Sequence, residues 1–179
     1  PPLIELLVSR TPAIYQPAVA HAVFPSLGAH LYQTYFRYID NCYHEATLAT
    51  LLMAPTGSGK SSVNTPIDYI MADIRERDDI NMAKERKWKR DTPSKGAHKD
   101  KRQRPEGIVI QCIDADITSA AFVQRMADAE GRFLYVRMNE IEQLNNLSNK
   151  GNAHSVFDLL CLCFDYGNLY GQTRISASS

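Results

Sequence analysis

The sequence contains no long apolar run that is free of charged residues, so we expect no segment that crosses a membrane. It has no recognisable secretory signal peptide and no internal repeat. Its four cysteines lack the paired spacing of a zinc site, and its five histidines show no ligand spacing. These absences favour a cytoplasmic protein with free, buried thiols.

The chain also has no initiator Met, and residues 174–179 resemble the start of a strand. We therefore expect a piece of a longer protein, and an incomplete domain within it. The length of 179 residues suits one domain with a core of its own.

Charge is balanced over the whole chain but unevenly distributed along it. Residues 84–104 hold ten Lys or Arg and three Asp or Glu, a net charge of +7. The other residues hold ten and seventeen, a net charge of −7. A basic segment on an acidic body indicates an anionic partner such as single- or double-stranded DNA. The alternative is a solvated helix or loop rich in salt bridges. The predicted nucleic-acid contacts are Lys84, Arg86, Lys87, Lys89, Arg90, Lys99, Lys101, Arg102 and Arg104.

Apolar spacing predicts strands that alternate with helices after a helical segment at residues 1–30. Asp116 or Thr118 is expected to cap one of these helices. The alternation indicates an α/β fold in three layers with a mainly parallel sheet. The predicted strands are residues 31–39, 46–53, 108–113 and 133–136.

The strongest functional signal is the glycine loop at residues 54–61, which follows an apolar run and precedes a helical pattern. Glycines at positions 57 and 59 let backbone N–H groups approach phosphate oxygens closely. Lys60 would reach the β- and γ-phosphates, and Ser61 would offer its hydroxyl to Mg²⁺. This is the Walker A pattern with Ala in the first position, and it predicts ATP and Mg²⁺ as cofactors. The predicted binding residues are Ala54, Pro55, Thr56, Gly57, Ser58, Gly59, Lys60, Ser61 and Ser62.

Hydrolysis would need a carboxylate that activates water, in addition to Lys60. Asp114 and Asp116 follow one predicted strand, where they could instead be a polar strand end and a helix cap. Glu140 follows another, where it could instead be a carboxylate at a helix start. We favour Glu140 as the catalytic carboxylate. Asn139 stands where an acidic residue is usual, and it can hold Mg²⁺ through a water molecule without adding charge.

Four stretches together resemble a family of P-loop proteins from bacterial mobile elements and phages, catalogued as a domain of unknown function and often found after primase-like modules. They are residues 54–61, the basic insert at 75–105, residues 116–122 with 129–132, and residues 133–140 followed by 164–167. The resemblance implies a RecA-like ATPase core, Mg-ATP at Lys60 and Ser61, and Glu140 as the Walker B glutamate.

Three functions follow as hypotheses. The first is an ATP-dependent, helicase-like enzyme that processes DNA in the replication or transfer of a mobile element. The second is a nucleotide-binding switch for DNA binding or assembly with little turnover, which Asn139 favours. The third is a P-loop kinase. In each case we expect a P-loop NTPase core over residues 31–179 with a projecting basic helical insert at 75–106. A homo-oligomer and a monomer are alternatives for the assembly of this core.

Overall fold

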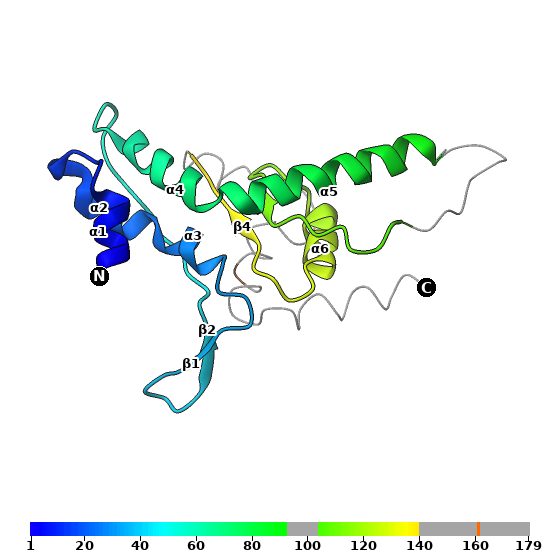
Figure 1. Ribbon diagram of the computed structural model, residues 1–179, viewed down its shortest axis with the longest axis horizontal. Coiled ribbons are helices and arrows are strands. Elements are labelled where there is room, and N and C mark those ends of the chain that lie inside the picture. The colour runs from blue at the N-terminus through cyan, green and yellow to red at the C-terminus, as the bar shows by residue number, and fades with distance from the viewer. Residues whose placement is uncertain (93–103, 140–160, 162–179) are drawn as a thin grey trace. The chain divides into compact units, whose positions relative to one another are not determined.

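The computed structural model describes residues 1–92, 104–139 and 161 (Figure 1). The chain divides into two compact units, Pro1–Asp73 and Ile74–Ser179. The helical segment 1–30 and the glycine loop at 54–61 therefore belong to the same unit.

The first unit begins with short helices whose starts are set by proline. Pro2, Pro17 and Pro25 each occupy the first turn of a helix, where the missing N–H costs no hydrogen bond. Val19 and Val23 are fully buried and anchor these helices to the core of the unit. The helices are α1 (Pro2–Val8), the 3-10 helix η1 (Ala13–Tyr15), α2 (Gln16–Ala22) and α3 (Phe24–Gly28).

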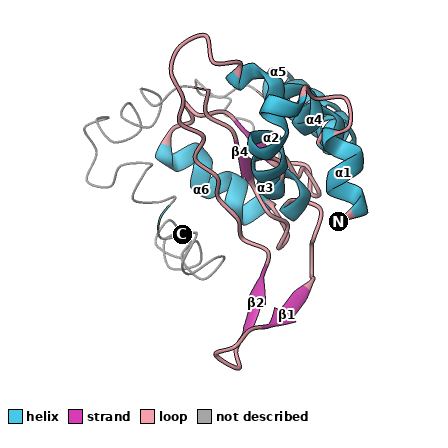
Figure 2. Cartoon of the chain, turned by 90° about the vertical axis from the view of Figure 1, so that its left-hand side faces the viewer, coloured by secondary structure: helices cyan, strands magenta, loops and turns pink. Residues whose placement is uncertain are grey.

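A two-stranded hairpin follows, formed by β1 (Tyr35–Arg37) and the antiparallel β2 (Tyr43–Glu45) (Figure 2). Its turn is organised by Asp40, which accepts a hydrogen bond from Cys42 N at 2.8 Å and lies 2.8 Å from His44 Nε2. These two contacts hold the pKa of Asp40 below its ordinary value.

The unit ends with the 3-10 helix η2 (Lys60–Val63) and helix α4 (Asn64–Ile70). Helix α2 contacts η2, and α3 contacts α4. The His30 ring lies 2.8 Å from Ile70 O and so links α3 to the end of α4. The N-terminal helices are thereby fastened to the segment that carries the glycine loop.

The second unit is built from the long helix α5 (Ala72–Asp91), whose first two residues belong to the first unit, and from β3 (Cys112–Ile113), α6 (Ser119–Asp128) and β4 (Tyr135–Val136). Strands β3 and β4 pair in parallel, with Cys112 opposite Tyr135. Thr118 caps α6 by accepting a hydrogen bond from Ala121 N at 3.3 Å, as the sequence predicts. Phe122 and Ile113 form the centre of an apolar cluster between α6 and the strand pair.

Asp78 joins α5 to the chain around β3. Its carboxylate is 3% exposed and accepts hydrogen bonds from Gln111 N at 3.0 Å and Cys112 N at 2.7 Å. Burial and the neighbouring Asp78 carboxylate raise the pKa of the Cys112 thiol to about 12, so this thiol is protonated at neutral pH.

A second junction joins α5 to α6 through Glu85, whose side chain is 10% exposed. Arg125 Nη2 lies 2.7 Å from Glu85 Oε2, and Arg104 Nη2 lies 3.1 Å from Oε1. Burial alone would raise the pKa of Glu85, but the hydrogen bond and charge of Arg125, with Lys89 and Arg104, hold it below its ordinary value.

This lowered pKa gives a pH dependence of stability with a definite sign. A group whose pKa falls on folding stabilises the protein above its ordinary pKa, and that stabilisation is lost as the pH falls through the folded value. We expect Glu85→Gln to lower the free energy of unfolding by about 2 kcal/mol at neutral pH. The difference from the wild type should shrink below pH 4.5, the ordinary value for Glu. Denaturant titrations at several pH values measure this difference, and a constant difference would contradict the role of the Glu85 charge.

The predicted three-layer, RecA-like α/β fold with a mainly parallel sheet is wrong. The described residues are mostly helical and hold two sheets of two strands each, one antiparallel and one parallel. Residues 46–53 form no strand, and Leu51 and Met53 are 71% and 79% exposed. A compact apolar run indicates a buried strand only where a neighbouring chain supplies a hydrogen-bonding partner, and its composition cannot specify that partner.

The burial of the cysteines and the lack of a membrane-spanning segment are two further expectations from the sequence. Cys42 and Cys161 are exposed and Cys112 is half-buried, so the prediction of buried thiols is wrong for Cys161 and only partly met at Cys112. In the described part of the chain, no helix is both long enough and apolar enough to cross a membrane.

Candidate functional site

The glycine loop turns sharply between the extended chain at 46–53 and η2. Gly57 and Gly59 have φ angles of 78° and 76°, in the left-handed region that glycine adopts without strain. Ser58 N donates a hydrogen bond to Pro55 O at 3.3 Å, which closes a tight turn inside the loop. The two glycines predicted to shape a phosphate cradle therefore do make the turns in this loop.

Lys60 folds back across the loop that precedes it. Its Nζ donates a hydrogen bond to Ala54 O at 2.7 Å, which ties the seventh residue of the motif to the first. An anionic phosphate oxygen forms a stronger, charge-assisted bond with an ammonium group than a neutral carbonyl does. Lys60 is exposed, so a phosphate on this surface could replace the carbonyl as its partner.

Three serines lie in or next to this turn. Ser61 is exposed on η2, and Ser62 N donates a hydrogen bond to Gly59 O at 3.0 Å. The Oγ atom of Ser58 is buried and has no hydrogen-bond partner within the described residues.

Tyr15 of the N-terminal helices covers the loop at Gly59. A β-carbon added at Gly59 would lie 2.5 Å from Tyr15 Cζ and 2.6 Å from its Oη. Sequence reasoning missed this contact, because no spacing rule connects residues 15 and 59. Tyr15 therefore holds the loop at the point where η2 begins.

Comparison of the two loop glycines gives a matched test. We expect Gly59→Ala to unfold the loop or displace Tyr15, because the new methyl group meets both a left-handed φ and the tyrosine ring. Gly57→Ala meets only the unfavourable φ, since nothing lies within 4 Å of its β-carbon, and should cost about 1 kcal/mol. Thermal unfolding of both variants checks this order. Equal losses would contradict the packing of Tyr15 on Gly59.

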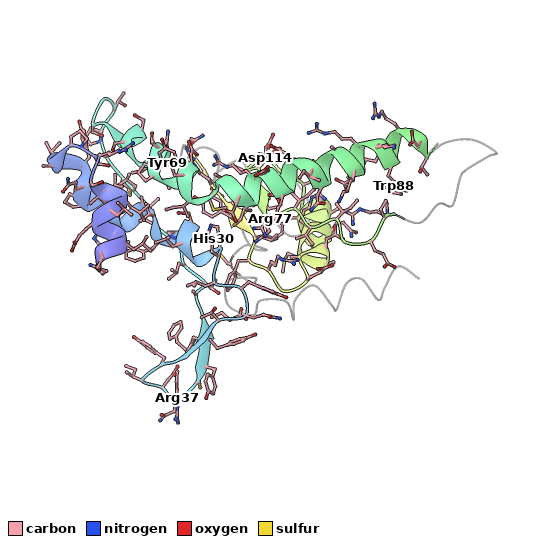
Figure 3. All side chains as sticks on the ribbon, in the orientation of Figure 1. His30, Arg37, Tyr69, Arg77, Trp88 and Asp114 are labelled. Carbon is pink, nitrogen blue, oxygen red and sulfur yellow. The ribbon has the colours of Figure 1, made fainter. Side chains whose placement is uncertain are left out.

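The residues predicted to act with Lys60 on water and magnesium lie in the second unit. Asp114 is exposed after β3 (Figure 3). Asp116 is also exposed, and Thr118 rather than Asp116 caps α6. Asn139 is exposed at the end of a described stretch, and Glu140 lies outside the described residues. The predicted roles of Ser61 and Asn139 toward Mg²⁺ and of Glu140 toward water therefore stay predictions.

Some cations of the basic segment are exposed to solvent, whereas Arg104 belongs to a cluster of ion pairs. Arg104 lies 3.1 Å from Glu85 and 2.8 Å from Asp128, so its guanidinium links α5 to α6. Lys99, Lys101 and Arg102 lie outside the described residues. The cations of the basic segment that are exposed along α5 are Lys84, Arg86, Lys87, Lys89 and Arg90.

The loop at 54–61 and the exposed cations of α5 are the features from which a function can be inferred, and the resemblance to the mobile-element family stays a prediction. No family model, no curated protein and no solved structure matches this chain.

Proposed function

We propose that this chain binds Mg-ATP at residues 54–62 and hydrolyses it while it acts on DNA, as a helicase-like enzyme in the replication or transfer of a mobile element. The observation that carries the proposal is the glycine loop itself. Two left-handed glycines turn it, and Lys60 closes it on Ala54 at 2.7 Å. A loop of this sequence and curvature presents backbone N–H groups and an ammonium group to one anion.

Each part of the loop has a distinct role in the proposal. The backbone from Ala54 to Gly59 surrounds the phosphates, and Lys60 neutralises the β- and γ-oxygens. Ser61, which is exposed, would offer its hydroxyl to Mg²⁺. Thr56 is an exposed residue of the turn.

Catalysis is assigned to Glu140, with Asn139 holding a magnesium-bound water. A carboxylate that orients or deprotonates water is a component of hydrolysis that the loop cannot supply. The proposal for DNA rests on the five cations of the basic segment that are exposed on α5, because a helix that offers several cations to solvent attracts a polyanion.

ATP turnover with and without single-stranded DNA tests the enzyme. We expect phosphate release that DNA stimulates and that Glu140→Gln removes while ATP binding is kept. Stimulated turnover that survives Glu140→Gln would remove Glu140 from its assigned role. Transfer of the γ-phosphate to an added nucleoside monophosphate would replace the hydrolase by a kinase.

A nucleotide-dependent switch is the second candidate, and Asn139 is the observation that favours it. An amide brings no negative charge to a magnesium site where a carboxylate is usual, which lowers the field that activates water. This candidate predicts ATP binding without phosphate release, together with DNA affinity or assembly that depends on ATP. Turnover in the assay above would exclude it.

A further inference from the structure

The N-terminal helices hold the chain on both sides of the glycine loop. Before the loop, Thr50 Oγ1 donates a hydrogen bond to His21 O in α2 at 3.2 Å. The backbone of Ala46 passes so close to Gly28 in α3 that a β-carbon added at Gly28 would lie 2.8 Å from Ala46 O. After the loop, η2 contacts α2. The loop is therefore held against these helices before any ligand binds, which lowers the entropic cost of binding.

Tyr15 reaches the loop from the junction of η1 and α2. It is the last residue of η1 and the N-cap of α2, and its backbone N–H donates to Pro12 O at 2.8 Å. The residue is half-buried. The three atoms nearest to a β-carbon added at Gly59 all belong to the hydroxyl end of the Tyr15 ring, with Cζ at 2.5 Å, Oη at 2.6 Å and Cε1 at 2.8 Å. The hydroxyl thus lies at the residue that immediately precedes Lys60.

This hydroxyl lies beside backbone that the proposed function assigns to phosphate binding. A phosphate held by the N–H groups around Gly59 and by Lys60 would be within reach of a side chain that touches Gly59. A phenol hydroxyl can donate a hydrogen bond to an anionic oxygen without adding a charge of its own. No hydrogen bond joins Tyr15 Oη to another residue in the part of the chain that the structure describes, so donation to a ligand breaks no such bond.

We propose that Tyr15 Oη donates a hydrogen bond to a phosphate oxygen of the nucleotide that the glycine loop binds. The proposal rests on the binding of Mg-ATP at residues 54–62 and adds a phosphate contact from the N-terminal helices. Tyr15 is outside the set of binding residues that the Walker A pattern predicts, because that pattern specifies only the loop itself. Since the contact is to phosphate, it should contribute equally to any ligand that carries the triphosphate.

Tyr15→Phe in the full chain tests the hydroxyl without removing the ring. Phenylalanine keeps the ring carbons that contact Gly59, so the thermal midpoint of unfolding without ligand should not change. We expect Kd for Mg-ATP to rise about tenfold, as for the loss of a hydrogen bond to a charged group. The Kd for inorganic tripolyphosphate with Mg²⁺ should rise by the same factor. Titration calorimetry with the two ligands measures both values.

Tyr43→Phe is the matched control for this variant. Tyr43 belongs to the same unit, lies on the hairpin strand β2 and is 74% exposed. The control removes the same hydroxyl group from a residue outside the loop and the N-terminal helices. It should leave both values of Kd within about twofold of the wild type.

Equal affinity of the wild type and Tyr15→Phe for Mg-ATP would overturn the phosphate contact while leaving the nucleotide site in place, as would equal losses in the two variants. A loss for Mg-ATP with unchanged affinity for tripolyphosphate would place the hydroxyl at the nucleoside and would also overturn the proposal. So would a lower thermal midpoint of the unliganded variant, because the hydroxyl would then stabilise the chain rather than the ligand. A wild-type chain that binds neither compound would remove the nucleotide site itself, and this result is read before any variant is compared.

Discussion

Replacing Lys60 with alanine is expected to weaken ATP binding about a hundredfold, because a hydrogen bond between an ammonium group and a phosphate contributes up to about 3 kcal/mol. The same change removes the hydrogen bond to Ala54 O, but that hydrogen bond is exposed and its acceptor is an uncharged carbonyl. The free energy of unfolding should therefore change by less than about 1 kcal/mol. Titration calorimetry with Mg-ATP measures the affinity, and thermal unfolding measures the stability.

Arg37→Ala is the matched control for Lys60→Ala. Arg37 is also an exposed cation of the first unit, on the hairpin strand β1 and outside the glycine loop (Figure 3). It should leave ATP affinity within about twofold of the wild type, since a single exposed charge away from the ligand is screened by salt. If both variants bind ATP as the wild type does, the loop is not the nucleotide site.

Replacing Asp78 with alanine is expected to lower the free energy of unfolding by about 3–5 kcal/mol. The carboxylate is 3% exposed and accepts the backbone N–H groups of both Gln111 and Cys112. Alanine would leave these two donors without their partner and release α5 from the chain around β3. Denaturant unfolding of the full chain measures the loss, and amide hydrogen exchange at residues 111 and 112 locates it.

Asp79→Ala provides the control, because Asp79 carries the same charge on the same helix but is exposed. It should change the free energy of unfolding by less than about 0.5 kcal/mol. Asp78→Asn keeps one carbonyl acceptor and should fall between the two alanine variants. Equal stability of the Asp78 and Asp79 variants would show that the carboxylate does not fasten α5.

Features set by a few neighbouring residues were predictable from the sequence. Thr118 caps α6, because a side-chain cap acts within one helical turn. The turns of the glycine loop follow in the same way from Gly57 and Gly59, whose positive φ angles need no distant contact.

The sheet was not predictable from the same patterns. The apolar run at 46–53 has the composition of a buried strand, yet it is extended and largely exposed. Within residues 108–113, predicted as one strand, only Cys112–Ile113 pairs with β4, and the Asp78 side chain takes the N–H groups of Gln111 and Cys112. A strand depends on which chain lies beside it, and hydrophobic spacing carries no information about that neighbour.

The sequence by itself determined the loop, its two left-handed glycines, the cap of α6 and the excess of positive charge after residue 84. The tertiary structure alone placed Tyr15 on Gly59 and bound Arg104 to Glu85 and Asp128. The first group depends on backbone preferences and charges that each residue carries with it. The second depends on contacts between residues that are 19 to 44 positions apart in the chain, as for Arg104 with Glu85 and Tyr15 with Gly59. Such contacts exist only after folding has brought those segments together.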